Sequence, residues 1–258
     1  MQIAVLQATT LGRRAVVRTA RQPANVVFPL IFPMLLLAVN AGGLKAETQL
    51  PGFPTNSFLA FALAVPFVQG ALLATVNANV EFARDIQTGF LNRLALTPVR
   101  GLVLLVGQLG GLLTIALVQA VFYLVVGVAF GVRLETGVAG ALLLLLLEAM
   151  IALAFASFGC WAALRTGSTE AVQGLFPVFF VFLFISSMNI PRNLIEATWF
   201  RWLATVNPVS YLIEAVRSLV ITGWDAEALG LGFAVACVMS VIGFALAARA
   251  LLHRLERT

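Results

Sequence analysis

The stretch VEFARDIQTGFLNRLALTPVRGL occupies residues 80–102 and carries three arginines, two carboxylates and a Thr-Pro pair. On both sides it is flanked by apolar runs of more than twenty residues, and a helix of about 20 apolar residues crosses a bilayer. The chain has 258 residues, of which 61% are hydrophobic and 10% are charged, whereas a soluble domain has about 25% charged residues. The composition therefore predicts an all-α integral membrane protein.

Six apolar stretches are long enough to be transmembrane helices, and they predict a single domain that covers residues 1–258. The predicted spans lie near 26–43, 57–80, 102–130, 138–164, 171–190 and 229–249. Residues 1–25 precede them and are typical of an amphipathic arm on the membrane surface, with arginines that reach the headgroups.

The basic residues are distributed unevenly between the two predicted faces of the membrane. Eleven of the sixteen lie on the face that holds both termini and residues 80–102. Because basic residues collect on the cytoplasmic side, both termini are predicted to be cytoplasmic, and the net charge of +5 reflects topology and not nucleic-acid binding. The two cysteines, Cys160 and Cys237, form no metal-binding or disulfide pattern.

Residues 81–96 read as a short amphipathic helix that ends at Thr97-Pro98, where proline removes a backbone donor. Phe82, Ile86, Phe90 and Leu94 would form its apolar stripe. The alternative is an ordinary surface loop whose arginines anchor it to the membrane.

The segment RDIQTGFLNRLALTPVRG resembles the coupling segment of type-2 permeases of ATP-binding cassette exporters. The matching positions are Arg84, Asp85, Thr88, Gly89, Leu91, Arg93, Leu94, Thr97, Pro98 and Val99. Asn92 departs from the pattern, since the family often has an acid or another polar residue there. A second segment, NPVSYLIEAVRSL at 207–219, resembles the same family's external motif through Asn207, Pro208, Ser210, Tyr211, Glu214 and Arg217. The resemblance is closest to the drug- and antibiotic-resistance branch.

This resemblance implies an exporter in a bacterial cytoplasmic membrane, built from two copies of the permease and two nucleotide-binding subunits. A coupling helix at 81–99 would pass the motion of the ATPase to the spans. The chain itself has no P-loop, because its single lysine, Lys45, lies in GLKAE. It is therefore predicted not to be an enzyme and to hold no cofactor, with ATP and magnesium on the partner subunit.

Residues 191–228 are predicted to form the long external segment, with short re-entrant helices as in the family. Asn207 is a good N-cap and Pro208 a good first-turn residue for a helix that runs to about residue 222. Such a helix is only about 22 Å long, too short to span the membrane. Glu214 and Arg217 are spaced to pair with each other. A plain surface helix is the alternative.

Glu148 is an acidic residue near the predicted middle of the membrane, where a carboxylate costs at least about 2.5–3.5 kcal/mol. Gln69 and Gln119 lie at a similar predicted depth, and a protonated Glu148 could bond to Gln119. The three residues are candidates for a substrate pathway or for contacts that only join helices. A hydrophobic drug, antibiotic or lipid is the favoured substrate. A polysaccharide or glycolipid exporter, or a proton-coupled transporter that uses Glu148, remain the alternatives.

Overall fold

The computed structural model describes residues 12, 17, 23–89 and 101–255. Its helices are α2 (Pro23–Gly43), α3 (Phe58–Ala62), α4 (Ala64–Gln87), α6 (Gly101–Ala129), α7 (Gly137–Thr166), α8 (Thr169–Gln173), α9 (Leu175–Phe184), α10 (Thr198–Val206), α11 (Pro208–Arg217) and α12 (Ala226–Leu255). Two short 3₁₀ helices (Lys45–Gln49 and Arg192–Leu194) and a π-helical segment (Ser218–Thr222) complete the list. The described residues contain no strand, so the predicted all-α fold is confirmed.

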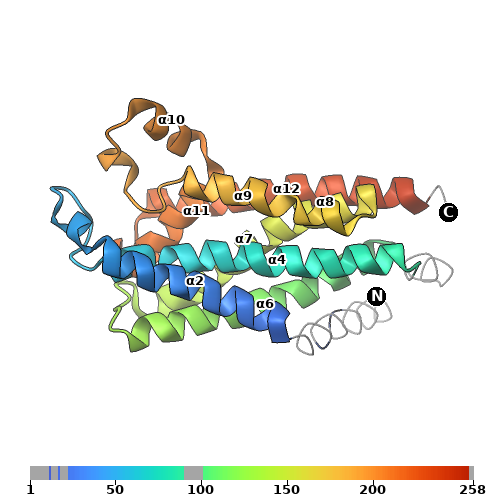
Figure 1. Ribbon diagram of the computed structural model, residues 1–258, viewed down its shortest axis with the longest axis horizontal. Coiled ribbons are helices and arrows are strands. Elements are labelled where there is room, and N and C mark those ends of the chain that lie inside the picture. Colours follow the sequence, from blue (N-terminus) through green and yellow to red (C-terminus); the bar gives the residue numbers. More distant parts are fainter. Residues whose placement is uncertain (1–11, 13–16, 18–22, 90–100, 256–258) are drawn as a thin grey trace.

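The long helices lie lengthwise, side by side, in one bundle (Figure 1). Five segments are long and apolar enough to cross a membrane: Val26–Gly43, Phe58–Gln87, Leu105–Ala129, Gly137–Thr166 and Ala226–Arg254. The start of α2 and the end of α12 lie at the same end of the bundle, which we call the basic end (Figure 1). The opposite end, where α10 projects from the bundle, is called the α10 end.

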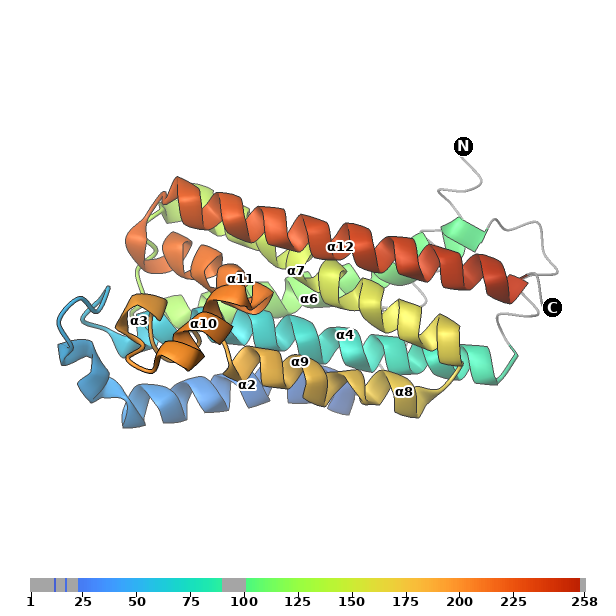
Figure 2. The same cartoon turned by 90° about the horizontal axis from the view of Figure 1, so that it is seen from above.

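The predicted fifth span, 171–190, is shorter than expected and is broken into two helices. Helix α8 ends at Gln173, and α9 begins at Leu175 and ends at Phe184. The break lies one turn before Pro177, which has no N–H to donate to the carbonyl of Gln173. Together α8 and α9 are about 24 Å long at 1.5 Å per residue, and they run along α4 (Figure 2).

Helix α4 forms the centre of the bundle. It packs against α2, α6, α7, α8, α9 and α11, and most of its residues are buried. Asn79 fixes its crossing with α7, because the Asn79 amide donates to the carbonyls of Thr75 and Ala156 and its oxygen accepts from the Cys160 thiol. Gly159 permits this contact, since a Cβ there would lie 2.2 Å from the Asn79 nitrogen.

Helix α2 contains two prolines, Pro29 and Pro33, and one of its backbone carbonyls accepts a hydrogen bond from another helix. Pro33 has no N–H, so the carbonyl of Pro29 lacks its usual helical donor. The hydroxyl of Tyr123, on α6, donates a hydrogen bond to that carbonyl. Tyr123 is fully buried and lies against Gly70 of α4, so this contact joins three helices.

Candidate functional site: the two ends of the bundle

At the basic end, α4 continues without interruption through Glu81 to Gln87. The prediction of one separate helix over 81–96 is therefore wrong at its beginning, because residues 81–87 belong to the preceding span. The helix ends at Gln87, Thr88 is its C-cap, and Gly89 follows with a φ of +72°, in the left-handed region. Glycine reaches this conformation without the steric cost that a Cβ imposes, so Gly89 ends the helix here.

The last two turns of α4 have two distinct faces. Phe82 and Ile86 are buried, whereas Arg84 and Thr88 are exposed and Asp85 is half-buried. Arg84 is exposed and forms an ion pair at 2.7 Å with Glu81, which is buried. The remaining predicted coupling residues lie outside the described residues: Leu91, Arg93, Leu94, Thr97 and Pro98. A coupling role for either set of residues stays a prediction.

At the α10 end, helix α11 begins where the sequence predicts. Asn207 is the N-cap, and its side-chain oxygen accepts from the backbone N–H of Val209 at 2.9 Å. Pro208 occupies the first turn, where a missing N–H costs nothing. The Asn207 amide also donates to the carbonyl of Phe182, so the cap holds α11 against α9.

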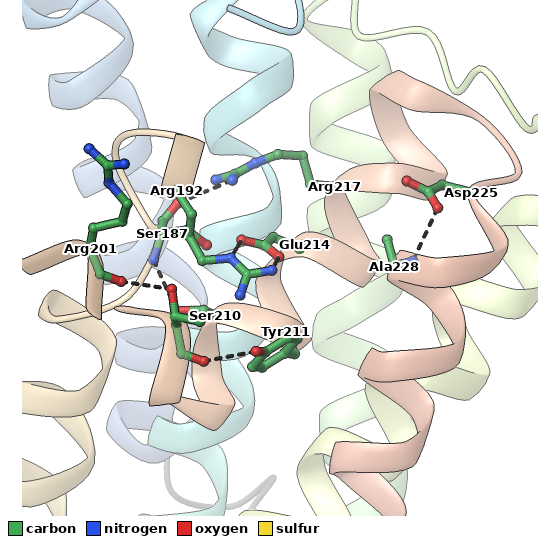
Figure 3. Close-up of polar contacts among 10 residues, drawn as sticks. Ser187, Arg192, Arg201, Ser210, Tyr211, Glu214, Arg217, Asp225 and Ala228 are labelled. Carbon is green, nitrogen blue, oxygen red and sulfur yellow. Dashed lines mark hydrogen bonds and ion pairs between the residues drawn. The ribbon is translucent and has the colours of Figure 1, made fainter. Parts of the chain in front are cut away.

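Arg217, the last residue of α11, is only 5% exposed and binds three backbone carbonyls, of which that of Ser187 is drawn in Figure 3. Its guanidinium donates to Phe61 at 3.3 Å, to Ser187 at 3.1 Å and to Met188 at 3.0 Å. The guanidinium carbon also lies 3.5 Å from the centre of the Phe61 ring. Burial lowers the pKa of Arg217 to about 9, and the nearby charge of Glu214 acts in the opposite direction. Arg217 thus joins α11 to α3 and to the segment after α9.

Glu214 does not pair with Arg217 as the spacing predicts. Its partner is Arg192, whose Nε and Nη2 donate to the two carboxylate oxygens at 2.7 and 2.6 Å (Figure 3). Arg192 also lies over the ring of Tyr211, 4.5 Å from its centre. Partial burial lowers the pKa of Arg192, but the attraction and hydrogen bonds of Glu214 outweigh it and raise the pKa above its usual value. Arg217 instead donates hydrogen bonds to backbone carbonyls of α3 and of residues 187–188.

The other residues of the 207–219 motif also make specific contacts. The Ser210 hydroxyl accepts from the N–H of Ser187 at 3.2 Å, and the Tyr211 hydroxyl donates to the carbonyl of Thr205 at 2.8 Å. Sequence reasoning missed Arg192, because its only signal is a basic side chain among the residues after the fifth span. Nearly every polar side chain of the motif therefore forms a hydrogen bond or ion pair that holds α11 against neighbouring segments.

A pocket of about 290 Å³ opens beside these contacts. Its lining includes Phe61, Arg192, Glu214, Arg217 and Asp225. Asp225 is already engaged, because its side chain accepts from the N–H groups of Glu227 and Ala228 at the start of α12. The described residues contain no group of three or more His, Cys, Asp or Glu side chains that could hold a metal ion.

The three polar residues predicted near the middle of the membrane are all buried, but their surroundings differ. Gln69 is 1% exposed and borders a cavity of about 100 Å³. The lining also includes Leu36, Asn40, Phe184, Met188 and Asn189. Gln119 and Glu148 line neither this cavity nor the pocket at the α10 end. The predicted bond between them is not formed, since both side chains are buried and neither has a hydrogen-bond partner among the described residues.

Comparison with known proteins agrees with this architecture. Residues 6–221 match the family model described as ABC-2 type transporter. The chain is 24% identical over 221 residues to the probable doxorubicin resistance ABC transporter permease protein DrrC of Mycobacterium tuberculosis, covering 85% of this chain and 78% of the relative. It is 25% identical over 266 residues to the putative transport permease ycf38 of Porphyra purpurea, covering 95% and 89%. With a family match over most of its length and a bundle of apolar helices, this chain is a multi-pass transport permease of the ABC-2 type transporter family.

Proposed function

We propose that the protein is the transmembrane subunit of an ATP-driven exporter, which moves a hydrophobic or amphiphilic drug, antibiotic or lipid out of the cytoplasm or the inner leaflet. A separate nucleotide-binding subunit supplies the energy, and two copies of this permease form the pathway. Both termini and residues 80–102 are then cytoplasmic, in a bacterial inner membrane. The name of the Mycobacterium tuberculosis relative, which refers to doxorubicin resistance, supports this substrate class.

The observation that carries the proposal is the continuity of α4. The helix starts at Ala64, directly after α3, and runs to Gln87, where the predicted coupling segment continues. A rigid element of this kind transmits a displacement from one end to the other. At the α10 end, the carbonyl of Phe61 on α3 accepts from Arg217 on α11. Movement of the coupling segment would thus reach both the bundle centre and the external helix.

The cavity beside Gln69 is the part of the described residues best suited to contact substrate. Leu36, Phe184 and Met188 supply apolar surface, and Asn40, Gln69 and Asn189 supply uncharged hydrogen-bonding groups. Such a lining fits an amphiphile better than a polysaccharide, which would need more polar contacts. Gln69 is therefore the first of the three mid-membrane residues to test for a substrate contact.

Coupling can be tested with two matched glycines. Gly89, at the basic end, has a φ of +72°, and Gly131, at the α10 end, has a φ of +91°. A Cβ at either position would meet no atom of the described residues within 4 Å. Alanine at each site therefore brings backbone strain of about 1–2 kcal/mol without a clash. We expect Gly89→Ala, but not Gly131→Ala, to reduce the stimulation of ATP hydrolysis by a transported amphiphile in a reconstituted complex. Equal effects of the two substitutions would contradict a coupling role for this end.

The partner and the direction of transport need a separate test. After affinity purification in mild detergent, an ATP-binding subunit should co-purify with the permease. Inverted membrane vesicles that contain both subunits should accumulate doxorubicin only when ATP is hydrolysed. Uphill movement by the permease alone, driven by a proton gradient, would refute the proposal and favour a secondary transporter.

A further inference from the structure

The pocket of about 290 Å³ at the α10 end has no role in the proposed function. Its volume is close to the lower limit of small-molecule sites, about 300–1,000 Å³, so it suits a small polar group better than a drug-sized molecule. Three of its lining residues, Asn193, Thr222 and Asp225, are exposed, so the pocket is open to its surroundings. The charged side chains of the lining are two arginines and two carboxylates: Arg192, Arg217, Glu214 and Asp225.

Two of these four charges neutralise each other within the protein. Arg192 donates to both carboxylate oxygens of Glu214, at 2.7 and 2.6 Å (Figure 3). The charges that remain for a ligand to complement are therefore those of Arg217 and Asp225.

Arg217 is a buried cation that lacks an ion partner among the described residues. Its three hydrogen bonds, one from each nitrogen, go to neutral backbone carbonyls. A guanidinium has five N–H donors, so two remain for a further acceptor. Burial of a charge without an ion partner is costly in free energy, and an anionic group in the pocket would reduce that cost.

Asp225 offers an acceptor of opposite charge to the same pocket. Its Oδ1 accepts from the N–H groups of Glu227 and Ala228, at 3.0 and 3.1 Å, and so caps α12. No hydrogen bond from the described residues reaches its Oδ2, which is left for a donor on a ligand. A simple anion would be repelled by Asp225 and a simple cation by Arg217, so the lining favours a zwitterion.

We propose that this pocket binds the headgroup of a phospholipid that carries both a phosphate and a primary ammonium, as phosphatidylethanolamine does. The phosphate accepts from the remaining N–H groups of Arg217, because a planar guanidinium matches phosphate oxygens. The ammonium donates to Oδ2 of Asp225. The site is separate from the cavity beside Gln69, and it does not depend on the proposed exporter function.

Two features beside the pocket favour a membrane lipid over a soluble zwitterion. Trp224, next to Asp225 in sequence, is 59% exposed, and tryptophan is enriched in the headgroup region of membranes. An apolar stripe with helical spacing also continues from the pocket along one face of α12: Ala228, Leu231, Val235, Val238 and Ile242. Leu231, Val238 and Ile242 are exposed, so an acyl chain can lie along them while the headgroup occupies the pocket.

Native mass spectrometry of the purified full-length permease, with added phospholipids of identical acyl chains, tests the assignment. Phosphatidylethanolamine should be retained about threefold to fivefold more than phosphatidylglycerol, which lacks the ammonium. It should also exceed phosphatidylcholine, whose trimethylammonium has no N–H to donate. Equal retention of the three lipids would overturn the proposal. Binding of free phosphoethanolamine without retention of any lipid would overturn the assignment to a membrane lipid.

Asp225→Asn removes the negative charge and keeps the helix cap, because asparagine caps a helix about as well as aspartate. This variant should lose the preference for phosphatidylethanolamine over phosphatidylglycerol. The matched control is Glu227→Gln, which removes an exposed acid from the first turn of α12 that does not line the pocket, and it should keep the preference. An unchanged preference in Asp225→Asn, or the same loss in both variants, would contradict the role of Asp225.

The phosphate contact is best tested by changing the ligand, since Arg217 also holds α11 in place. In the Asp225→Asn permease, phosphatidylglycerol should be retained more than a diacylglycerol with the same chains, because only the phospholipid has a phosphate for Arg217. Equal retention of these two lipids would overturn the phosphate contact.

Discussion

The hydroxyl of Tyr123 donates to the carbonyl of Pro29 the hydrogen bond that Pro33, which has no N–H, cannot donate. The contribution of this hydrogen bond to the stability of the bundle can be measured. We expect Tyr123→Phe to leave the carbonyl of Pro29 without a donor inside the bundle, where both residues are buried. An unsatisfied buried polar group costs about 1–3 kcal/mol. For a chain of this size each kcal/mol lowers the unfolding midpoint by about 2–4 °C, so a loss of about 2 kcal/mol corresponds to about 4–8 °C.

The matched background is Pro33→Ala, which returns an N–H to position 33 and so gives the Pro29 carbonyl its ordinary helical donor. In that background Tyr123→Phe should cost less by about 1 kcal/mol, since the carbonyl is no longer left unpaired. Thermal unfolding of the four proteins in one detergent, followed by tryptophan fluorescence, measures this difference. Tyr211→Phe is a control, because that hydroxyl donates to Thr205 at an exposed position where water can replace it.

Two results would refute this reasoning. The first is an unchanged midpoint for Tyr123→Phe in the wild-type background. The second is the same loss in the wild-type and Pro33→Ala backgrounds, which would mean that the hydroxyl stabilises the bundle through packing against Gly70 and not through the Pro29 carbonyl.

Three further contacts lead to predictions of the same kind. A double-mutant cycle with Arg192→Gln and Glu214→Gln should give a coupling energy of about 1–2 kcal/mol in thermal unfolding, and additive effects would exclude a stabilising pair. Gly159→Ala should destabilise the α4–α7 crossing, because the new Cβ would lie 2.2 Å from Asn79. Combination with Asn79→Ala should recover part of that loss, and a larger combined loss would contradict the clash. Arg217→Lys should lower stability by about 2 kcal/mol or more, because an ammonium cannot reproduce three carbonyl contacts and stacking on a ring, and near wild-type unfolding would contradict this.

The local character of most segments could be predicted from the sequence. Apolar length located the long helices, and Asn207-Pro208 marked the start of α11, because a cap and a first-turn proline act within a few residues. Helix ends near the coupling segment were less predictable. The stripe of Phe82 and Ile86 is equally compatible with a new helix and with the continuation of α4, and only the unbroken course of α4 to Gln87 in the structure distinguishes the two.

By itself, the sequence determined that the chain is an α-helical membrane protein with a charged interruption at 80–102, since composition and periodicity depend on nothing beyond the chain itself. The partners of its polar side chains were decided only by the tertiary structure. Glu214 pairs with Arg192, which lies 22 residues away in sequence, and Tyr123 donates to Pro29, which lies 94 residues away. Spacing along one helix identifies neighbours on that helix, but it carries no information about which other helix packs against it. That choice follows from the packing of the whole bundle.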